Sequence, residues 1–288
     1  MNSQDTPYFS PEELLQAPIA RAAYSDRTAW LMGKLALLAY NPFEISDDNL
    51  NELKSCLGSG GFQLVRTFNT TKTGTQAYLC HNNLFGVLVF RGTEICGVDL
   101  RTDLDLWPIL SKGSEIHSGF NEAWESTREE CRKATNELNM PFYVTGHSLG
   151  AALATLAARD LEGDNLAACY TFGSPRVGDY RLDWEIKTPV YRVVNKVDGV
   201  TLVPFPFLFF HFHHVGDVRY FDSHGRLNRS IHRFFYLCSS VIWALITKWK
   251  FALAVDHSMD GYVAVLENYA EARNPKLHIA SKITPGQA

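Results

Sequence analysis

The chain has 288 residues, of which 46% are hydrophobic and 20% charged, a composition that supplies a sizeable core and excludes an intrinsically disordered protein. The formal net charge of −4 gives no basic surface that would bind a nucleic acid, but it is compatible with a neutral or apolar substrate. Because no internal repeat or low-complexity linker interrupts the sequence, we expect one domain over residues 1–288, with loose ends at 1–10 and 275–288.

The N-terminal stretch MNSQDTPYFSPEELL has neither a basic region nor an apolar region, so we expect no conventional secretory signal. A cytoplasmic protein, or one exported by another route, fits this pattern. The six cysteines form no C-x-x-C pair, which favours buried free thiols. The longest apolar stretch, residues 234–247, is shorter than the ~18–20 residues that span a bilayer, so it predicts a buried helix or an interfacial segment and no transmembrane span.

Expected strands and helices alternate along the chain, which predicts an α/β fold with a mostly parallel central sheet flanked by helices and joined by right-handed crossovers. The run LFGVLVF at 84–90 is apolar throughout, as is typical of a strand buried on both faces of a sheet. In chain order, the expected elements are a helix over 26–40, strands over 62–69, 76–81 and 84–90, a helix over 121–138, a strand over 142–145, a helix from 149, strands over 167–172 and 190–195, a hairpin over 217–229 and a helix over 257–270.

The stretch YVTGHSLGAALATLA at 143–157 places a serine, Ser148, between two glycines at a strand-to-helix junction. A G-x-S-x-G sequence in that setting is typical of a nucleophile held on a strained, tight turn. Gly146 and Gly150 lack a Cβ and so allow the strand and the helix to approach closely. A plain Gly-Ser turn is the alternative, but the strand before and the helix after favour a nucleophile.

A serine nucleophile needs a base and an orienting carboxylate, which follow in the chain order Ser, Asp or Glu, His in this layout. His257, in VDHSMDGY, is our candidate base, although other histidines also follow the serine. Asp198 directly follows the strand VYRVVN and is our candidate acid, with Asp179 and Asp222 as rivals on order alone. The backbone N–H of Leu149 and the residue Thr93, which follows the strand at 84–90, are candidates for an oxyanion hole.

Six motifs together resemble the fungal-type, or class 3, lipases. They are FRGT at 90–93, IHSGF at 116–120, GHSLG at 146–150, GSPRVGD at 173–179, NKVDGVTLVP at 195–204 and DHSMDGY at 256–262. The resemblance implies an α/β-hydrolase fold with Ser148 as nucleophile, Asp198 as acid and His257 as base. It also implies an oxyanion hole from Thr93 and Leu149 and a mobile lid within 94–105. Two features depart from the secreted fungal members, since signal and disulfide patterns are absent and residues 234–255 are apolar instead of polar.

The uncharged loop TLVPFPFLFF at 201–210 predicts an apolar binding surface, with packing beneath another loop as the alternative. Our candidate acyl contacts are Leu202, Phe205, Phe207 and Val255. The HFHH sequence at 211–214 lacks a fourth ligand at metal spacing, so we expect no metal and no cofactor.

The sequence therefore predicts a serine carboxylic ester hydrolase, foremost a triacylglycerol lipase that acts on medium- to long-chain acyl esters at a lipid–water interface. Phospholipase A1 and a short-acyl or feruloyl esterase are the alternatives on the same fold. A non-catalytic lipid-binding module is a more remote alternative, because fold does not imply function. Sequence reasoning does not rank triacylglycerol against phospholipid.

Overall fold

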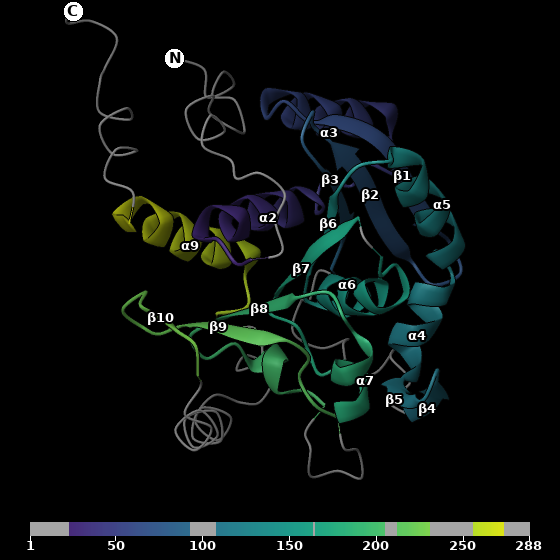
Figure 1. The fold of residues 1–288 in the computed structure, drawn as a ribbon. Helices are drawn as coiled ribbons and strands as arrows, with labels where there is room; N and C mark the ends of the chain where they lie inside the picture. The colour runs from purple at the N-terminus through teal and green to yellow at the C-terminus, as the bar shows by residue number, and fades with distance from the viewer. Residues whose placement is uncertain (1–22, 93–107, 164, 205–211, 231–255, 274–288) are drawn as a thin grey trace, which may run out of the picture.

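The computed structural model describes residues 23–92, 108–163, 165–204, 212–230 and 256–273, and Figure 1 shows how they are arranged. An eight-stranded sheet runs through the molecule in the order β1-β2-β3-β6-β7-β8-β9-β10. The neighbours from β3 to β9 are parallel, whereas β1, β2 and β10 pair antiparallel at the two edges. The strands are β1 (Gln63–Thr70), β2 (Thr75–His81), β3 (Gly86–Phe90), β6 (Phe142–His147), β7 (Leu166–Phe172), β8 (Val190–Asn195), β9 (Asp217–Phe221) and β10 (Leu227–Asn228). The prediction of a mostly parallel sheet is confirmed.

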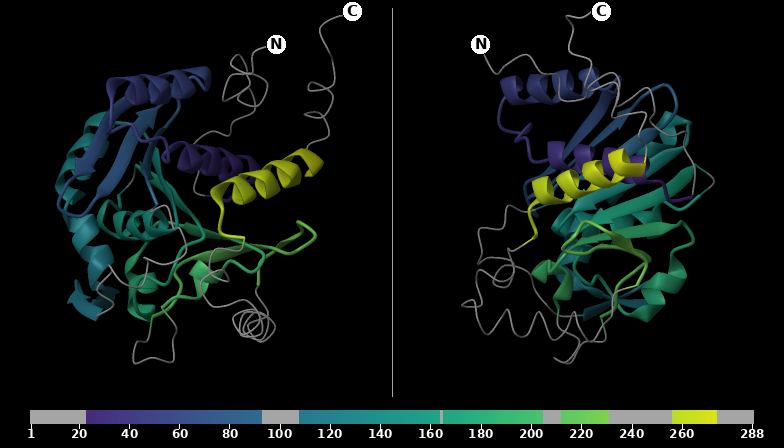
Figure 2. Two further views of the ribbon diagram at one scale, coloured as in Figure 1. Left: turned by 180° about the vertical axis from the view of Figure 1, so that it is seen from behind. Right: turned by 90° about the vertical axis from the view of Figure 1, so that its left-hand side faces the viewer.

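Helices cover both faces of the sheet. Helices α2 (Asp26–Leu38) and α9 (Met259–Arg273) lie side by side on one face, and α4 (Ser118–Glu125), α5 (Arg128–Leu138) and α6 (Leu149–Asp160) cover the other, as Figures 1 and 2 show. Two apolar clusters divide the core between these faces. Alternate residues of β3 enter different clusters, which is why this strand is apolar at every position and buried throughout.

The expected helix over 121–138 is two helices, α4 and α5, separated at Ser126 and Thr127. The Ser126 hydroxyl donates to the Ala123 carbonyl at 2.7 Å and also meets the hydroxyl of Thr73 at 2.8 Å, in the turn between β1 and β2. A serine that bonds the backbone in this way competes with continued helix. The predicted apolar stripe is still correct, since Trp124 and Cys131 are buried in one cluster.

Four elements, namely α3, β4, β5 and α7, were not expected from the sequence. Helix α3 (Asp47–Ser59) begins at Ser46, whose hydroxyl accepts from the Asn49 N–H. Strands β4 (Pro108–Ser111) and β5 (Ser114–His117) form a separate two-stranded hairpin. Helix α7 (Tyr180–Glu185) begins after Asp179, whose carboxylate accepts from the Arg181 N–H. A capping oxygen stabilises the first turn of both helices, a signal that local sequence does carry.

None of the described helices is long and apolar enough to cross a membrane. The apolar segment 234–255 and the expected lid at 94–105 lie outside the described residues. The four described cysteines are free thiols, and three of them, Cys80, Cys131 and Cys169, are buried as expected.

Candidate active site

Ser148 stands at the junction of β6 and α6, with backbone angles φ 57° and ψ −125°. A positive φ is strained for any residue with a Cβ, and such strain collects at functional sites. The flanking glycines are required by close approach: a Cβ on Gly146 would lie 2.3 Å from the Gly150 carbonyl oxygen, and one on Gly150 would lie 2.3 Å from that of Phe90. The predicted nucleophile turn is therefore present.

His257 and Asp198 form a buried pair. The His257 Nδ1 lies 2.9 Å and 2.8 Å from the two carboxylate oxygens of Asp198, and the side chains are 8% and 0% exposed. The carboxylate also accepts from the Val200 N–H at 2.9 Å and from the Tyr262 hydroxyl at 2.5 Å. An ionised carboxylate only accepts hydrogen bonds, so His257 Nδ1 carries a proton and its Nε2 is left as the basic nitrogen.

The Ser148 Oγ and the His257 Nε2 are both buried, and neither has a hydrogen-bond partner among the described residues. One stretch of chain packs against both groups. The Phe172 carbonyl accepts from the Ser148 N–H at 3.0 Å, and a Cβ on the next residue, Gly173, would lie 2.7 Å from an Asp198 oxygen and 2.9 Å from the His257 ring. Buried polar atoms are nearly always hydrogen-bonded. Two buried atoms without a partner among the described residues, both on residues that pack against Phe172 and Gly173, therefore indicate a reactive site. Such hydrogen bonds commonly tighten only when substrate binds.

The rival acids lie elsewhere. Asp179 caps α7 and its carboxylate accepts from the Arg181 Nε at 2.6 Å. Asp222 lies in the turn between β9 and β10, where it accepts from the His224 N–H at 2.9 Å and from the Arg226 guanidinium at 3.0 Å. Of the three carboxylates, the structure therefore brings Asp198 to His257.

Sequence reasoning missed a second histidine in the site, His147. Its Nδ1 accepts from the Tyr40 hydroxyl at 2.6 Å, its Nε2 donates to the His257 carbonyl at 2.8 Å, and the two imidazole rings lie 4.5 Å apart. Burial, and then the positive charge that His257 acquires, hold the pKa of His147 well below its ordinary value. His147 precedes Ser148, and the chain order Ser, Asp or Glu, His excludes it as the base but not as a neighbour of the base.

Tyr262 was also missed, although it closes the DHSMDGY motif. It lies one turn into α9, which brings its hydroxyl back onto Asp198. Its position near the start of the expected helix was the available signal, since helical side chains tilt towards the N-terminus of their own helix.

Leu149 is the first residue of α6, and first-turn N–H groups have no acceptor within their own helix. Its amide therefore adjoins Ser148 at the positive end of the helix dipole, as an oxyanion donor requires. Leu202 is 7% exposed in the short 3-10 helix Gly199–Leu202. Thr93, Phe205, Phe207 and Val255 lie outside the described residues, and their assigned roles stay predictions.

Across the described residues, no group of three or more histidine, cysteine or acidic side chains is placed to hold a metal ion. His211 of the HFHH sequence lies outside those residues. His214 is partly buried, and desolvation, followed by the neighbouring guanidinium of Arg192, lowers its pKa well below the ordinary value.

Comparison with known proteins agrees with this geometry. Residues 87–208 match the family of class 3 lipases. A 99-residue stretch is 42% identical to the triacylglycerol lipase OBL1 of Ricinus communis, covering 30% of this chain and 19% of that protein. A stretch of 125 residues is 38% identical to the secreted mono- and diacylglycerol lipase A of Penicillium cyclopium, covering 40% of this chain and 41% of that protein. The chain thus matches less than half the length of these curated relatives.

Solved structures give wider coverage. Lipase II from Rhizopus niveus superposes with a TM-score of 0.57 at 25% identity, over 68% of this chain and 79% of that one. A triacylglycerol lipase in which a serine protease triad forms the catalytic centre gives a TM-score of 0.59 at 25% identity, over 71% and 84% of the two chains. Residues 87–208 thus match the class 3 lipase family, and the chain shares the α/β-hydrolase fold of these solved fungal-type lipases.

Proposed function

We propose that this protein hydrolyses carboxylic esters through a covalent acyl-enzyme on Ser148. One observation carries the proposal: His257 is bonded through Nδ1 to the buried Asp198 carboxylate, and neither its Nε2 nor the Oγ of the strained Ser148 has a hydrogen-bond partner among the described residues. Relatives named as triacylglycerol lipases and as mono- and diacylglycerol lipases support it.

In the acylation half, the Ser148 Oγ attacks the ester carbonyl carbon while His257 Nε2 takes the hydroxyl proton. The carbonyl π electrons move to oxygen, and the Leu149 N–H, with Thr93 as the predicted second donor, stabilises that oxyanion. The carbonyl re-forms, the C–O bond to the alcohol breaks, and His257 returns its proton to the departing alcohol. Asp198 keeps the imidazole oriented and stabilises the imidazolium.

In the second half, water adds to the acyl-enzyme while His257 takes one of its protons. The Ser148 Oγ–acyl bond then breaks, His257 reprotonates the serine, and a carboxylic acid leaves. His147 stays neutral throughout, because its pKa is held low and both of its ring nitrogens are bonded.

We further propose that the substrates are medium- to long-chain acylglycerols. The named relatives support this class, and so does the uncharged sequence at 201–210. Each buried methylene contributes about 0.8 kcal/mol, so eight of them offer about 6 kcal/mol that an acetyl group lacks. The value of kcat/KM should therefore rise from acetyl to longer acyl esters.

The test is a series of p-nitrophenyl esters from two to sixteen acyl carbons, run beside phosphatidylcholine and across the solubility limit of each ester. A fluorophosphonate probe should label the wild type and not Ser148→Ala. A preference for acetyl esters would overturn the hypothesis that the protein is a lipase and would indicate a hydrolase of small esters. Preferential release of acyl chains from phosphatidylcholine would favour phospholipase A1. Absence of labelling and of turnover would leave a non-catalytic lipid-binding module.

A further inference from the structure

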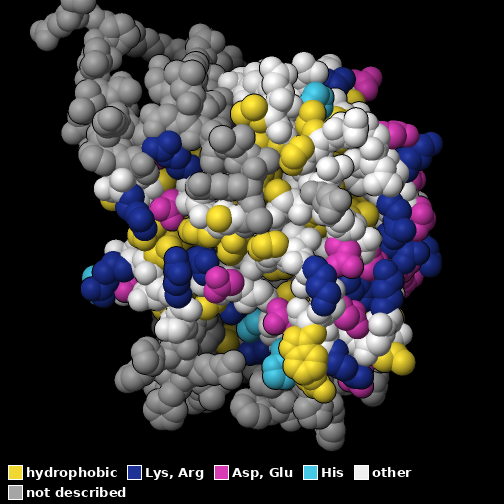
Figure 3. All heavy atoms as spheres, in the orientation of Figure 1, with side chains coloured by type: hydrophobic (Ala, Val, Ile, Leu, Met, Phe, Trp, Pro, Cys, Tyr) yellow, Lys and Arg dark blue, Asp and Glu magenta, His cyan; other side chains and the backbone are white. Residues whose placement is uncertain are grey.

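Large hydrophobic side chains are exposed at few places on the described part of the molecule, and most of them gather in one region. Seven such side chains are exposed among the described residues, and four of the seven lie on β4 and α7. These four are Ile109 at 37%, Leu110 at 73%, Tyr180 at 49% and Trp184 at 68%. The Tyr180 and Trp184 rings pack edge to face with centroids 5.0 Å apart. Figure 3 shows hydrophobic side chains standing out over α7, with basic side chains beside them.

The hairpin and α7 form one continuous surface. The Asp179 N–H donates to the Glu115 carbonyl at 2.8 Å, and Gly178 forms an isolated bridge with Ile116 of β5. Leu110 is the register partner of Glu115, whose carboxylate lies 3.7 Å from the Arg181 guanidinium on α7. The exposed residues of β4 are therefore one strand away from α7.

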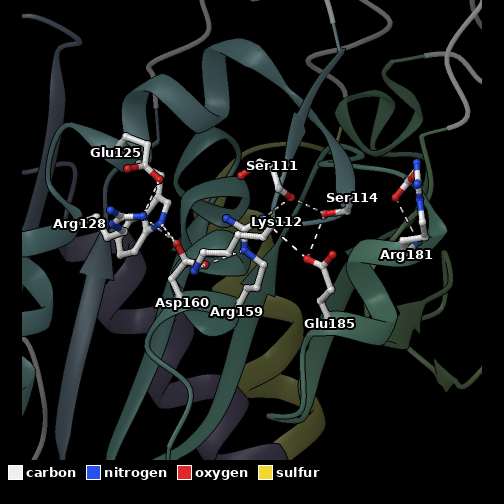
Figure 4. A network of polar contacts seen from close by, with 11 residues as sticks. Ser111, Lys112, Ser114, Glu125, Arg128, Arg159, Asp160, Arg181 and Glu185 are labelled. Atoms are coloured by element: carbon white, nitrogen blue, oxygen red, sulfur yellow. Dashed lines mark hydrogen bonds and ion pairs between the residues drawn. The ribbon is translucent and has the colours of Figure 1, made fainter.

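A groove of about 510 Å³ separates Trp184 from the turn of the hairpin. Four basic and two acidic side chains line it, together with Gly113 and Trp184 itself: Lys112, Arg159, Arg181, Lys187, Glu162 and Glu185. Ion pairs and hydrogen bonds connect the side chains beside the groove, as Figure 4 shows. Lys112 and Arg159 both contact the Asp160 carboxylate, and the Glu185 carboxylate lies between Ser114 and Arg159.

The basic groups at the rim are partly exposed to solvent. The Lys112 side chain is 49% exposed and that of Arg181 is 40% exposed, while the Lys187 ammonium donates to the Trp184 carbonyl at 2.8 Å. Their carboxylate partners are buried, since the side chains of Asp160 and Asp179 are 0% and 4% exposed, so these pairs stay in place and a phosphate would bind the remaining N–H donors. Arg181 also has five donors, of which Asp179 engages the Nε.

This surface lies close to the candidate active site along the chain. Gly173, which packs on His257 and Asp198, is six residues before Asp179, the cap of α7. Gly178 also bridges to His213, and the His213 ring lies 6.3 Å from that of Tyr180. Six residues span at most about 21 Å, so a contact made by α7 would keep the candidate site within roughly that distance of whatever α7 binds.

We propose that Tyr180, Trp184 and Leu110, ringed by Lys112, Arg181 and Lys187, form a docking surface for an anionic phospholipid layer. Tyrosine and tryptophan rings favour the boundary between head groups and acyl chains, because one end of each is apolar and the other polar. Basic side chains beside them gain affinity from the negative surface of the layer, about fivefold for each residue. The proposal rests on the proposed function, because it names the surface on which the ester substrate is met.

The first test measures binding to vesicles in a Ser148→Ala background, which prevents hydrolysis during the assay. Vesicles of phosphatidylcholine are compared with vesicles containing 30% phosphatidylserine, by co-sedimentation at low and high salt. Tyr180→Ala with Trp184→Ala should weaken binding to both vesicles at least tenfold. Lys112→Glu with Lys187→Glu should remove the preference for phosphatidylserine and its salt dependence. Ile45→Ala, which trims a 73% exposed residue outside this surface, is the matched control and should bind as the parent does.

Binding of the aromatic pair variant within twofold of the parent would overturn the proposal. So would full competition by inorganic phosphate at millimolar concentration, because the groove would then be a site for a free anion. A third overturning result is a charge variant that keeps the preference for phosphatidylserine.

The second test separates docking from catalysis, using the Tyr180→Ala, Trp184→Ala variant with Ser148 intact. Its turnover of soluble p-nitrophenyl butyrate should equal that of the wild type, whereas its rate on ester dispersed in phosphatidylserine-containing vesicles should fall about tenfold. Equal rates of the two proteins on the vesicles would contradict docking. If the wild type itself does not hydrolyse the soluble ester, the proposed function fails, and the vesicle-binding result still decides the docking surface.

Discussion

Removing the Tyr262 hydroxyl should weaken catalysis without changing substrate binding. That hydroxyl donates to the Asp198 carboxylate at 2.5 Å, and both side chains are fully buried. In Tyr262→Phe the carboxylate keeps the Val200 N–H and His257, but it loses its shortest hydrogen bond. Asp198 would then hold the His257 imidazolium less firmly in the transition state.

A hydrogen bond to a charged group contributes about 1.5–3 kcal/mol. Each 1.36 kcal/mol of transition-state stabilisation is a tenfold change in rate, so the loss corresponds to about 10- to 150-fold in kcat. KM should change little, because the hydroxyl contacts the carboxylate and not the ester. The assay is steady-state hydrolysis of a soluble p-nitrophenyl ester by folded variant protein.

The matched control is Tyr78→Phe. The Tyr78 hydroxyl is also buried, but it donates to the Leu35 backbone carbonyl at 2.7 Å, between β2 and α2. This variant should lose stability and keep kcat. If Tyr262→Phe stays within twofold of wild-type kcat, Tyr262 does not help to position the pair, and the reasoning is refuted.

Three further perturbations test the same site. Ser148→Ala and His257→Ala should each lower kcat by about 10⁴–10⁶, and the double variant should be little worse than either, because the groups act as a unit; additive losses would refute the assignment. Gly173→Ala should greatly lower kcat, since its Cβ would lie 2.7 Å from the Asp198 carboxylate in a backbone with φ +56°. The control Gly74→Ala has a similar backbone strain, with φ +63°, but nothing lies within 4 Å of its Cβ, so this variant should stay active. Equal activities of the two variants would contradict the packing argument. The low pKa of His147 means that the unfolded chain binds a proton below about pH 6.5 that the folded chain does not. Stability is therefore lost as pH falls below that value, and urea unfolding of His147→Gln should depend less on pH between 7.5 and 5 than that of the wild type; parallel curves would count against a neutral, buried His147.

The sequence by itself determined the features that depend on neighbours along the chain. The apolar run at 84–90 predicted a strand buried on both faces, because alternate side chains of a strand point to opposite faces. The turn at Ser148 could also be predicted from the sequence, since the two glycines that allow β6 and α6 to approach closely lie within two residues of the serine. Order along the chain reduced the number of candidates for the base and the acid, but it left three carboxylates as candidates for the acid.

Only the tertiary structure decided which groups meet. Asp198 and His257 are 59 residues apart, Tyr262 is 64 residues from the same carboxylate, and His147 is 107 residues from Tyr40. No local propensity encodes such contacts, because they arise when α2 and α9 pack on the same face of the sheet. The break between α4 and α5 has the same origin, since the Ser126 hydroxyl also meets a turn more than 50 residues away. Periodicity reports which face of an element is apolar, but the polar partners of a buried side chain are set by how the elements pack together.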